Sequence, residues 1–570
     1  MIYHELIVVG GGLAGLRAAV EAKKQGIDVA VISQVWPGRS HSGAAQGGVN
    51  AALANHPDSA DDTWEKHAFD TVKGSDYLAD QNAVAQMTKD AIPIIYEMEH
   101  WGCPFSRFDD GRIAQRPFGG AGYPRTCYGA DKTGHYMLHT LVERAAAAGV
   151  TMYVEWFVNR LVVDDGVCRG VVAYDMMKGG FEFFQGDAVI VATGGAGRTY
   201  GNTTNAIIST GYGMAMAYHA GVPLKDLEFV QFHPTGLLTT NILMTEGARG
   251  EGGYLVNGLG ERFMKKYAPT AMELAPRDIT SRSIQTEINE GRGIDGKGFV
   301  YLDLRHLGAQ KILEQLPGIR DLAIHFEGVD PIEEPIPIVP SQHYSMGGID
   351  TDMDGRTIMP GLYAAGECAC VSVHGANRLG GNSLLETVVF GRRAGAAATE
   401  HLGGLAAKKG SAAAGEAAVI AARAQVDDLA SRAGSAGAED PYAIRLGMTT
   451  TMKDHFGVFR EASVMQAGLD KMIDLKQRVR NIGLRHTGGV FNLDMIRTVE
   501  LEGMVDVALA IAAGALARTE SRGSHSRTDF PDRDDANWLR HTLAFNTPDG
   551  PSLESKPVAL GMFEPQERKY

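Results

Sequence analysis

The sequence predicts an α/β fold in which a Rossmann-like domain is split by an inserted α+β domain and followed by a helical bundle and a C-terminal domain. An apolar run at 5–9 leads through the glycines of G10-G-G-L-A-G15 into an amphipathic stretch at 13–25. This order of strand, turn and helix opens a dinucleotide-binding unit. Apolar segments that end in glycine-rich turns recur at 188–193 and 361–366. The same sheet is therefore expected to continue far along the chain.

Each glycine of the opening turn has a separate task. Gly10 permits the sharp bend, Gly12 lets the backbone approach a pyrophosphate, and Gly15 lets the helix pack on the strand. The phosphates are expected at the helix N-terminus, where free N–H groups attract anions. A second strand is predicted at 29–33. This context favours a bound dinucleotide over a glycine-rich turn without a ligand.

The end of the second strand indicates which dinucleotide is bound. An acidic residue for the adenosine ribose is expected there in nicotinamide-binding proteins, but the sequence has Ser33-Gln34. Two later segments, A188-V-I-V-A-T-G-G-A-G-R198 and G361-L-Y-A-A-G-E-C-A369, would each bring backbone N–H groups near a long cofactor. The sequence therefore favours FAD.

Changes of pattern along the chain predict five segments, because the first sheet is completed only after an insertion. They are 1–228 and 346–405 for the two parts of the FAD-binding domain, 229–345 for the capping domain, 406–522 for the helical domain and 523–570 for the C-terminal domain. Helical patterns lie at 277–290, 306–316, 417–433, 441–455, 461–481 and 494–518, with a small-residue linker at 402–415. The tail from Gly523 is polar and Pro-rich, with no strong secondary-structure pattern.

Composition narrows the class of protein. A chain of 570 residues exceeds what one hydrophobic core usually supports, so two to four domains are expected. The net charge of −14 argues against nucleic-acid binding. No secretory segment precedes the first strand, and no apolar run is long enough to span a bilayer, so no direct membrane insertion is expected. The cysteines are odd in number and scattered along the chain, which predicts a reducing compartment and no metal cluster. They are Cys103, Cys127, Cys168, Cys368 and Cys370.

Cationic side chains in glycine-rich or turn-rich segments are the candidates for chemistry. They are His233, Arg249, Arg277, His343 and Arg378, and four of the five fall in the insertion. In an acidic protein, their convergence on a flavin would create a local positive pocket. Because arginine forks onto a carboxylate, the predicted substrate is a small dicarboxylate.

Seven strings in the sequence are highly specific when taken together. They are G10-G-G-L-A-G, R39-S-H-S-G-A-A-Q-G-G, R112-I-A-Q-R-P-F-G-G, Q231-F-H-P-T-G, T245-E-G-A-R-G-E-G-G, H374-G-A-N-R-L-G-G-N-S and E520-S-R-G-S-H-S-R-T-D-F-P. With them the chain resembles, nearly end to end, the flavoprotein subunit of succinate dehydrogenase and quinol:fumarate reductase. The resemblance implies interconversion of succinate and fumarate. It also implies that His41 carries FAD covalently, through an imidazole nitrogen bonded to the 8α carbon of the flavin, and that this link raises the flavin potential.

The resemblance assigns further site residues. His233, Thr245, His343 and Arg378 would bind the substrate carboxylates, and Arg277 would transfer the proton along a path with Glu246 and Arg249. The cofactor-binding residues expected from the motifs and the resemblance are Gly10, Gly12, Leu13, Ala14, Gly15, Ser33, Gln34, Arg39, Ser40, His41, Ala45, Gln46, Gly47, Gly48, Phe157, Ala192, Thr193, Gly194, Glu367, Arg378, Ser383 and Leu384.

The resemblance also implies partners. Electrons would leave through an iron-sulfur subunit to a membrane anchor with a quinone site and haem b, on the cytoplasmic face of a bacterial inner membrane. Tyr212 stands where many members have an Asp near the FAD ribose. The segment S341-Q-H-Y-S-M-G-G and the pair Cys127-Tyr128 also depart from many succinate dehydrogenases. These departures resemble the menaquinone-linked branch. The direction of catalysis depends on potentials that other chains carry.

Other functions stay open at this level. L-aspartate oxidase shares the fold and much of the pocket but lacks the tethering histidine, so His41 counts against it. A soluble fumarate reductase would need a redox domain such as a haem segment with C-x-x-C-H, which the sequence lacks. A flavin-binding assembly subunit would be expected to have lost some of the cationic residues.

Single residues also have simpler interpretations. His41 could only hydrogen-bond a phosphate or pack in its loop, and His233 could cap a turn. Arg277 could form a salt bridge at the helix start with Asp278 or a neighbour, and Arg378 could pair with Glu386.

Overall fold

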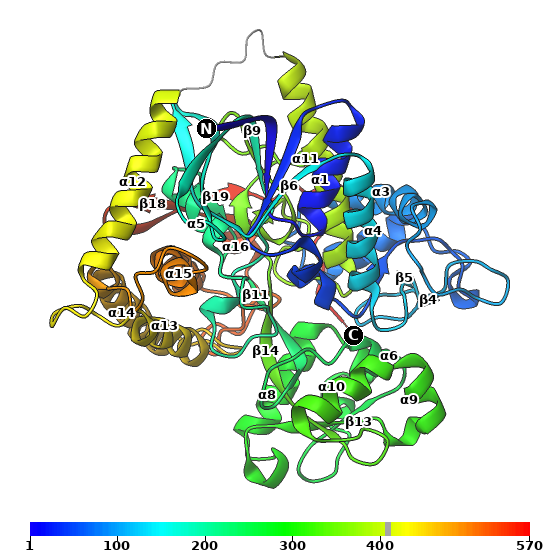
Figure 1. Cartoon of the computed structure of the whole chain (residues 1–570). Coiled ribbons are helices and arrows are strands. Elements are labelled where there is room, and N and C mark those ends of the chain that lie inside the picture. The colour runs from blue at the N-terminus through cyan, green and yellow to red at the C-terminus, as the bar shows by residue number, and fades with distance from the viewer. Residues whose placement is uncertain (405–411, 570) are drawn as a thin grey trace.

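The computed structural model describes residues 1–404 and 412–569, and its largest sheet has seven strands (Figure 1). The order is β6-β2-β1-β9-β8-β7, and β16 also pairs with β9. The strands are β1 (Ile2–Val9), β2 (Val29–Ser33), β6 (Thr151–Val154), β7 (Trp156–Asp164), β8 (Val167–Asp175), β9 (Phe181–Val191) and β16 (Leu362–Ala364). The pairings of β1 with β2 and β9, of β2 with β6 and of β16 with β9 are parallel. The strand predicted at 361–366 thus joins the first sheet.

Helices cover both faces of this sheet, with α12 (Ala412–Ser431) on one side and α1 (Leu13–Lys24), α4 (Thr133–Ala147) and α11 (Asn382–Gly404) on the other (Figure 1). The packing of α1 on α11 depends on glycines. A Cβ at Gly391 would lie 2.5 Å from the Ala14 carbonyl oxygen, and one at Gly395 would lie 2.4 Å from that of Ala18. Both distances are too short for any side chain, so the two backbones lie in direct contact. The predicted boundary at 405–406 and the middle of the predicted linker at 402–415 lie outside the described residues.

The inserted segment forms a separate body, drawn in green below the rest in Figure 1. Its four-stranded sheet has the order β11-β14-β13-β12, from β11 (Val230–Leu237), β12 (Tyr254–Val256), β13 (Val300–Asp303) and β14 (Ile336–Ser345). One buried apolar cluster is drawn entirely from residues between Leu237 and Ile338. The helix predicted at 277–290 is α8 (Arg277–Asn289), and that at 306–316 is a short turn followed by α9 (Ala309–Gln315). The sequence pattern missed α10 (Pro317–Glu327) and α6 (Glu246–Gly250).

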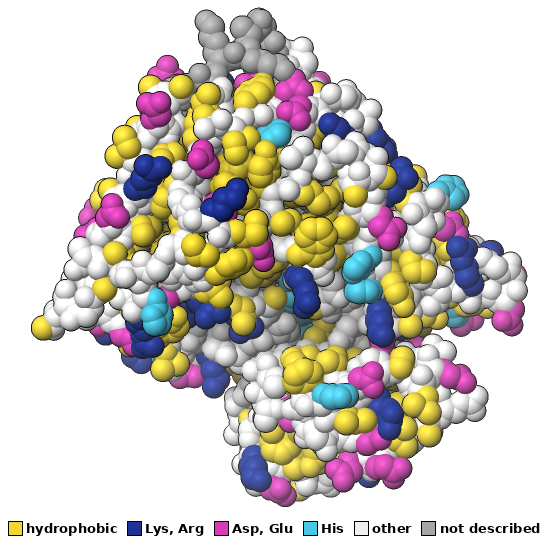
Figure 2. All heavy atoms as spheres, in the orientation of Figure 1, with side chains coloured by type: hydrophobic (Ala, Val, Ile, Leu, Met, Phe, Trp, Pro, Cys, Tyr) yellow, Lys and Arg dark blue, Asp and Glu magenta, His cyan; other side chains and the backbone are white. Residues whose placement is uncertain are grey.

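The predicted helices after residue 412 form and pack together. They are α12, α13 (Pro441–His455), α14 (Ala462–Arg478) and α15 (Leu493–Ala517). The last is buried on almost every side, because it packs on both α13 and α14 and contacts α5 (Tyr212–His219) of the first part of the chain. No helix among the described residues is long and apolar enough to cross a bilayer. Acidic and basic side chains are intermixed over the face drawn in Figure 2.

The C-terminal tail corrects an expectation, because it contains a regular hairpin of β18 (Arg540–Thr547) and β19 (Gly550–Pro557). The hairpin extends a five-stranded sheet in the order β17-β15-β10-β18-β19, with β10 (Leu224–Lys225), β15 (Gly348–Asp350) and β17 (Ala369–Cys370). The strands therefore come from three of the five predicted segments. The segment boundaries themselves stay predictions.

A buried histidine holds this hairpin in place. Nδ1 of His541 lies 2.6 Å from a carboxylate oxygen of Asp226, and its Nε2 lies 3.1 Å from one of Asp80. Burial favours the neutral ring, but the two carboxylates outweigh it and raise the pKa of His541 to about 9. The fold of the tail thus depends on partners that lie far away in the sequence.

Candidate functional site

A cavity of about 760 Å³ lies where the first sheet, the inserted body and helix α11 meet. Its volume is within the range of ligand pockets, roughly 300–1,000 Å³. All of the predicted site residues line it except Gly15, Arg39 and Arg249. Gly15 packs beneath the turn, where its Cβ would lie 2.0 Å from the Gly10 carbonyl oxygen. The structure does not place Arg39 in the cavity, because the short helix Pro37–Arg39 ends there with the arginine exposed.

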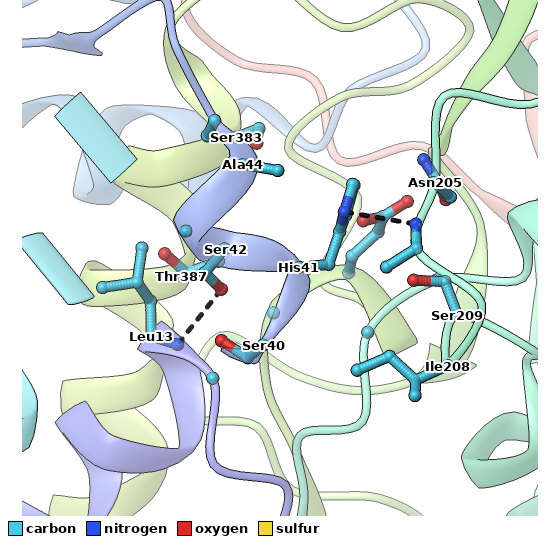
Figure 3. A pocket seen from close by; sticks show the side chains of 18 of the residues that line it. Leu13, Ser40, His41, Ser42, Ala44, Asn205, Ile208, Ser209, Ser383 and Thr387 are labelled. Atoms are coloured by element: carbon cyan, nitrogen blue, oxygen red, sulfur yellow. Dashed lines mark hydrogen bonds between the residues drawn. The ribbon is translucent and has the colours of Figure 1, made fainter. Parts of the chain in front are cut away.

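The glycine turn presents backbone to one end of the cavity. Gly10 has φ +116°, and a Cβ there would lie 2.2 Å from the Ala192 carbonyl oxygen, so only glycine fits. Helix α1 begins after Gly12 without a capping side chain on that residue. The Leu13 N–H, in its first turn, donates to Ser42 Oγ at 3.3 Å (Figure 3). A helix N-terminus that opens onto a cavity suits a phosphate.

Buried polar atoms around the cavity indicate a polar ligand. Ser40 Oγ, Gln46 Oε1, Thr193 Oγ and His233 Nε2 are buried with no hydrogen-bond partner among the described residues, and all four residues line the cavity. An unsatisfied buried polar group costs roughly 1–3 kcal/mol. Such groups persist when a ligand satisfies them. Together with the glycine turn, these residues fit FAD.

His41 lies on a short helical turn, His41–Ala44, with its ring directed across the cavity toward the loop that carries Asn205 and Ser209 (Figure 3). Its Nδ1 accepts a hydrogen bond of 3.3 Å from the backbone N–H of Ala206. Desolvation in the cavity and the nearby Arg198 guanidinium lower the pKa of His41 to about 4. The imidazole is therefore neutral at pH 7, with Nδ1 occupied as an acceptor.

The two predicted substrate histidines face each other at the other end. The rings of His233 and His343 are 5.0 Å apart in an edge-on arrangement. Burial, with the Arg277 guanidinium nearby, lowers the pKa of both histidines well below its usual value. Nδ1 of His233 accepts the Thr235 N–H at 3.2 Å, so this residue does cap its turn, as the simpler interpretation held. Its Nε2 is nevertheless unpartnered and lies at the cavity.

The two arginines of the site are held together by an amide that the sequence analysis did not single out. Gln231 Oε1 accepts one N–H from Arg277 and one from Arg378, each at 3.1 Å. Gln231 and His233 are two residues apart on β11, and regular alternation would place both on one face of the strand. That spacing is a signal for Gln231, but the pairing of β11 with β14 shifts register between Gln231 and Phe232. The hydrogen bonds to the two arginines therefore establish its position. Two guanidinium groups thus meet at the cavity, and the Glu246 carboxylate pairs with that of Arg277.

Two of the three predicted relay residues, Arg277 and Glu246, are in direct contact. Arg277 donates from Nε to Glu246 Oε2 at 2.7 Å, and Glu246 Oε1 accepts the Gly119 N–H at 2.7 Å. Burial favours the neutral acid, but the guanidinium groups of Arg277 and Arg249 outweigh it and lower the pKa of Glu246. Arg249 lies behind Glu246, donates to the Glu273 carbonyl, and has Nε and one terminal nitrogen unpartnered among the described residues. The alternative pair of Arg277 with Asp278 does not form, because Asp278 pairs with Arg282 and Arg568.

Arg378 is also free of its alternative partner. Glu386 accepts hydrogen bonds from Tyr344 and His374 instead. The Arg378 guanidinium lies 4.3 Å from the centre of the Tyr344 ring, and burial together with Arg277 lowers its pKa to about 9. The Tyr344–Glu386–His374 cluster was not found from the sequence. It holds the ring on which Arg378 stacks.

The Asp131 carboxylate also joins the inserted body to the first part of the chain beside the cavity. Asp131, which precedes α4, accepts the N–H groups of Gly318 at 2.6 Å and Ile319 at 3.2 Å. These groups open helix α10. Asp131 therefore caps a helix that belongs to the insertion. Its negative charge stabilises that helix, because a helix N-terminus carries a partial positive charge.

We expect Asp131→Ala to loosen this contact. Because loss of an N-cap costs about 1 kcal/mol, amide hydrogen exchange at Gly318 and Ile319 should accelerate roughly fivefold. Mass spectrometry of peptides that span α10 measures the change. Lys132→Ala, at the exposed neighbouring position, should leave the exchange rate as it was. Unchanged exchange in Asp131→Ala would show that other contacts hold the insertion in place.

Comparisons with known proteins agree across the whole chain. A family model described as "FAD binding domain" matches residues 5–384, and one described as "Fumarate reductase flavoprotein C-term" matches residues 445–570. A succinate dehydrogenase flavoprotein subunit of Rickettsia bellii is 45% identical over 582 residues, which cover 98% of this chain and 96% of that protein. A fumarate reductase flavoprotein subunit of Mycobacterium tuberculosis is 45% identical over 587 residues, which cover 100% and 99%. Among solved structures, a chain of E. coli quinol fumarate reductase superposes with a TM-score of 0.95 at 43% identity, covering 99% of this chain and 98% of that one.

Proposed function

The chain belongs to the family of succinate dehydrogenase and fumarate reductase flavoprotein subunits, and on this basis we propose that it interconverts succinate and fumarate within a membrane-associated succinate:quinone oxidoreductase. The observation that carries the proposal is the convergence of His233, His343, Arg277 and Arg378 on the FAD cavity. When bound, FAD supplies the hydride acceptor or donor at its flavin ring. The residues of the chain supply binding, orientation and the proton.

The cofactor is held along the length of the cavity. Gly10, Gly12 and the start of α1 receive the pyrophosphate, as the free N–H groups of the helix favour. His41 carries the flavin covalently at its 8α carbon. Because Nδ1 accepts the Ala206 N–H, Nε2 is the nitrogen left for that bond.

The substrate is a four-carbon dicarboxylate. Arg378 forks onto one carboxylate, and His343, His233 and Thr245 bind the other. Arg378 and His233 are buried, and no ion pair holds the Arg378 guanidinium within the described parts of the chain. The substrate therefore replaces water as the partner of these groups, which strengthens each contact.

Arg277 moves the proton. Its guanidinium is held by Glu246 at Nε and at one terminal nitrogen, each at 2.7 Å. Its other terminal nitrogen donates to Gln231 at 3.1 Å, and Arg277 lines the cavity. An isolated guanidinium barely deprotonates. When Arg277 gives a proton to fumarate, Glu246 therefore passes a proton to Arg277. Arg249, which is buried near Glu246, then supplies the next proton to Glu246. The path runs the other way in succinate oxidation.

The fold divides this work among five segments. Residues 1–228 and 346–405 form the FAD-binding domain and 229–345 the capping domain, with 406–522 as the helical domain and 523–570 as the C-terminal domain. The separate apolar core of the insertion supports its role as a cap.

An iron-sulfur subunit accepts the electrons and passes them to a membrane anchor with haem b. A structural relative solved with menaquinol supports menaquinone as the quinone, and the complex lies on the cytoplasmic face of a bacterial inner membrane.

Two measurements on the purified chain test the proposal. The chain is denatured in acid and run on a gel, and we expect flavin fluorescence on the band and, by mass, on the peptide that contains His41. Succinate should then bleach the flavin absorbance of the native protein, whereas aspartate should not. Flavin that runs free of the band would contradict the covalent link. Bleaching by aspartate in place of succinate would assign the chain to L-aspartate oxidase chemistry.

A further inference from the structure

One end of the FAD cavity lacks the acidic residue that usually holds an adenosine ribose. Strand β2 ends at Ser33, followed by Gln34, so the carboxylate expected at this point is missing. The cavity wall near this point is aromatic, because β6 pairs with β2 at Val154 and Ser33, and Phe157 follows three residues later. The rings of Phe157 and Tyr212 stack with centres 5.4 Å apart and planes 28° from parallel, and the Tyr212 hydroxyl donates to the Asn159 carbonyl oxygen at 2.8 Å.

A carboxylate from a distant part of the chain reaches the same wall. Glu500, in the second turn of α15, lines the cavity and is only 3% exposed. Thr210 donates from Oγ to Glu500 Oε1 at 3.1 Å. Gly503 holds this part of α15 against the aromatic wall, since a Cβ there would lie 2.9 Å from the Tyr212 ring.

Glu500 is short of partners. In the described chain it forms no ion pair within 4 Å, and Thr210 is the one side chain that donates to it. Burial raises the pKa of Glu500 to about 7, because the Arg445 and Arg497 guanidinium groups and the Thr210 hydrogen bond compensate only in part for the lost hydration of the carboxylate. A buried carboxylate with so few donors costs free energy unless a ligand donates to it. The second oxygen, Oε2, is the atom left to accept.

We propose that Glu500 accepts hydrogen bonds from the adenosine ribose hydroxyls of FAD, so that helix α15 supplies the ribose carboxylate that the end of β2 lacks. The inference rests on the proposed function in that FAD occupies the cavity. It assigns to the helical part of the chain a direct contact with the cofactor. It also explains why a carboxylate is buried here beside Thr210 and an aromatic pair.

The test measures release of FAD in place of turnover. His41→Ser provides a parent whose FAD is not tethered, and Glu500→Leu and Glu500→Gln are added to it. Holoprotein is diluted into an excess of flavin scavenger, and the rate constant of release is followed by flavin fluorescence. Because a hydrogen bond to a charged group is worth roughly 1.5–3 kcal/mol, Glu500→Leu should accelerate release about tenfold or more. Glu500→Gln, which retains the shape of the side chain, should give a smaller acceleration.

An altered cofactor separates a ribose contact from a packing effect. The same release is measured with an FAD analogue whose adenosine ribose lacks the 2′ and 3′ hydroxyls. The parent should release this analogue faster than FAD, and the Glu500 variants should release it no faster than the parent does. Glu502→Gln is the matched control, because Glu502 is 46% exposed and pairs with Lys476 at 3.3 Å. It should behave as the parent with both cofactors.

Three results would overturn the inference. Unchanged FAD release in both Glu500 variants would show that no contact exists, and equal acceleration of FAD and the analogue would show that Glu500 acts through packing. If the unmodified chain releases its FAD on denaturation, the tether proposal fails by itself, and the release assay is then run in the unmodified chain. If the unmodified chain binds no FAD, the proposed function and this inference fall together.

Discussion

Arg277→Lys should abolish both succinate oxidation and fumarate reduction while FAD stays attached. Arg277 presents separate nitrogens to Glu246 and to Gln231, whereas a lysine has one nitrogen and cannot reach both while facing the substrate. The loss of a positioned proton donor typically lowers the rate by about 10²- to 10⁴-fold. Because the step is shared by both directions, both should fall together.

Steady-state assays with artificial electron donors and acceptors measure this effect without the partner subunits. Flavin content, from the absorbance of the purified protein, shows whether the site is intact. The matched control is Arg282→Lys on the same helix, where the side chain pairs with Asp278 at 3.1 Å and faces away from the cavity. Control activity should stay near that of the unmodified chain. Turnover of Arg277→Lys within tenfold of that level would remove Arg277 from the proton path.

His41→Ser should leave FAD bound but extractable, and should affect the two directions unequally. The proposed tether raises the flavin potential, and for a two-electron couple about 30 mV corresponds to a tenfold change in equilibrium constant. Succinate is a poor hydride donor, so its oxidation should fall by about tenfold or more. Fumarate reduction with a strong reductant should continue, because the groups around His233 and His343 are unchanged.

Fluorescence of the denatured protein on a gel and the ratio of the two activities check this prediction. His139→Ser is a suitable control, since His139 is exposed on α4 and its ring contacts that of His135. That variant should retain the fluorescent band and both activities. Succinate oxidation at the normal rate by His41→Ser would contradict the argument for the tether.

Much of the fold could be predicted because the signals are local. The turn at Gly10 to Gly15, strand β2 and helix α13 were placed by glycine spacing and apolar periodicity, which depend on neighbours a few residues away. The cationic site residues were also identifiable, because histidine and arginine in glycine-rich turns are unusual in an acidic chain. The partners with which these residues pair could not be identified from the sequence. Whether Arg277 binds Asp278 or Glu246 depends on how α8 and α6 pack.

The hairpin of β18 and β19 could not be predicted from local sequence patterns. Its outer strand is largely exposed and lacks regular alternation, and its inner strand is stabilised by β10 and by the contacts of His541 with Asp226 and Asp80. None of these partners is near in sequence. Helix α10 does carry local signals that were not used, Pro317 at its start and the left-handed Gly328 at its end, although the cap of its N-terminus, Asp131, comes from another part of the chain.

The dinucleotide turn, the main helices and the residue types of the site can all be inferred from the sequence. Those features follow from backbone preferences and periodic burial, which act over a few residues. Which of these residues meet depends on the folded chain: Gln231 lies between Arg277 and Arg378, Tyr344 beneath Arg378, and Glu500 beside Thr210. Such contacts depend on where buried polar groups find partners as distant segments pack, and in this chain those partners lie tens to hundreds of residues apart.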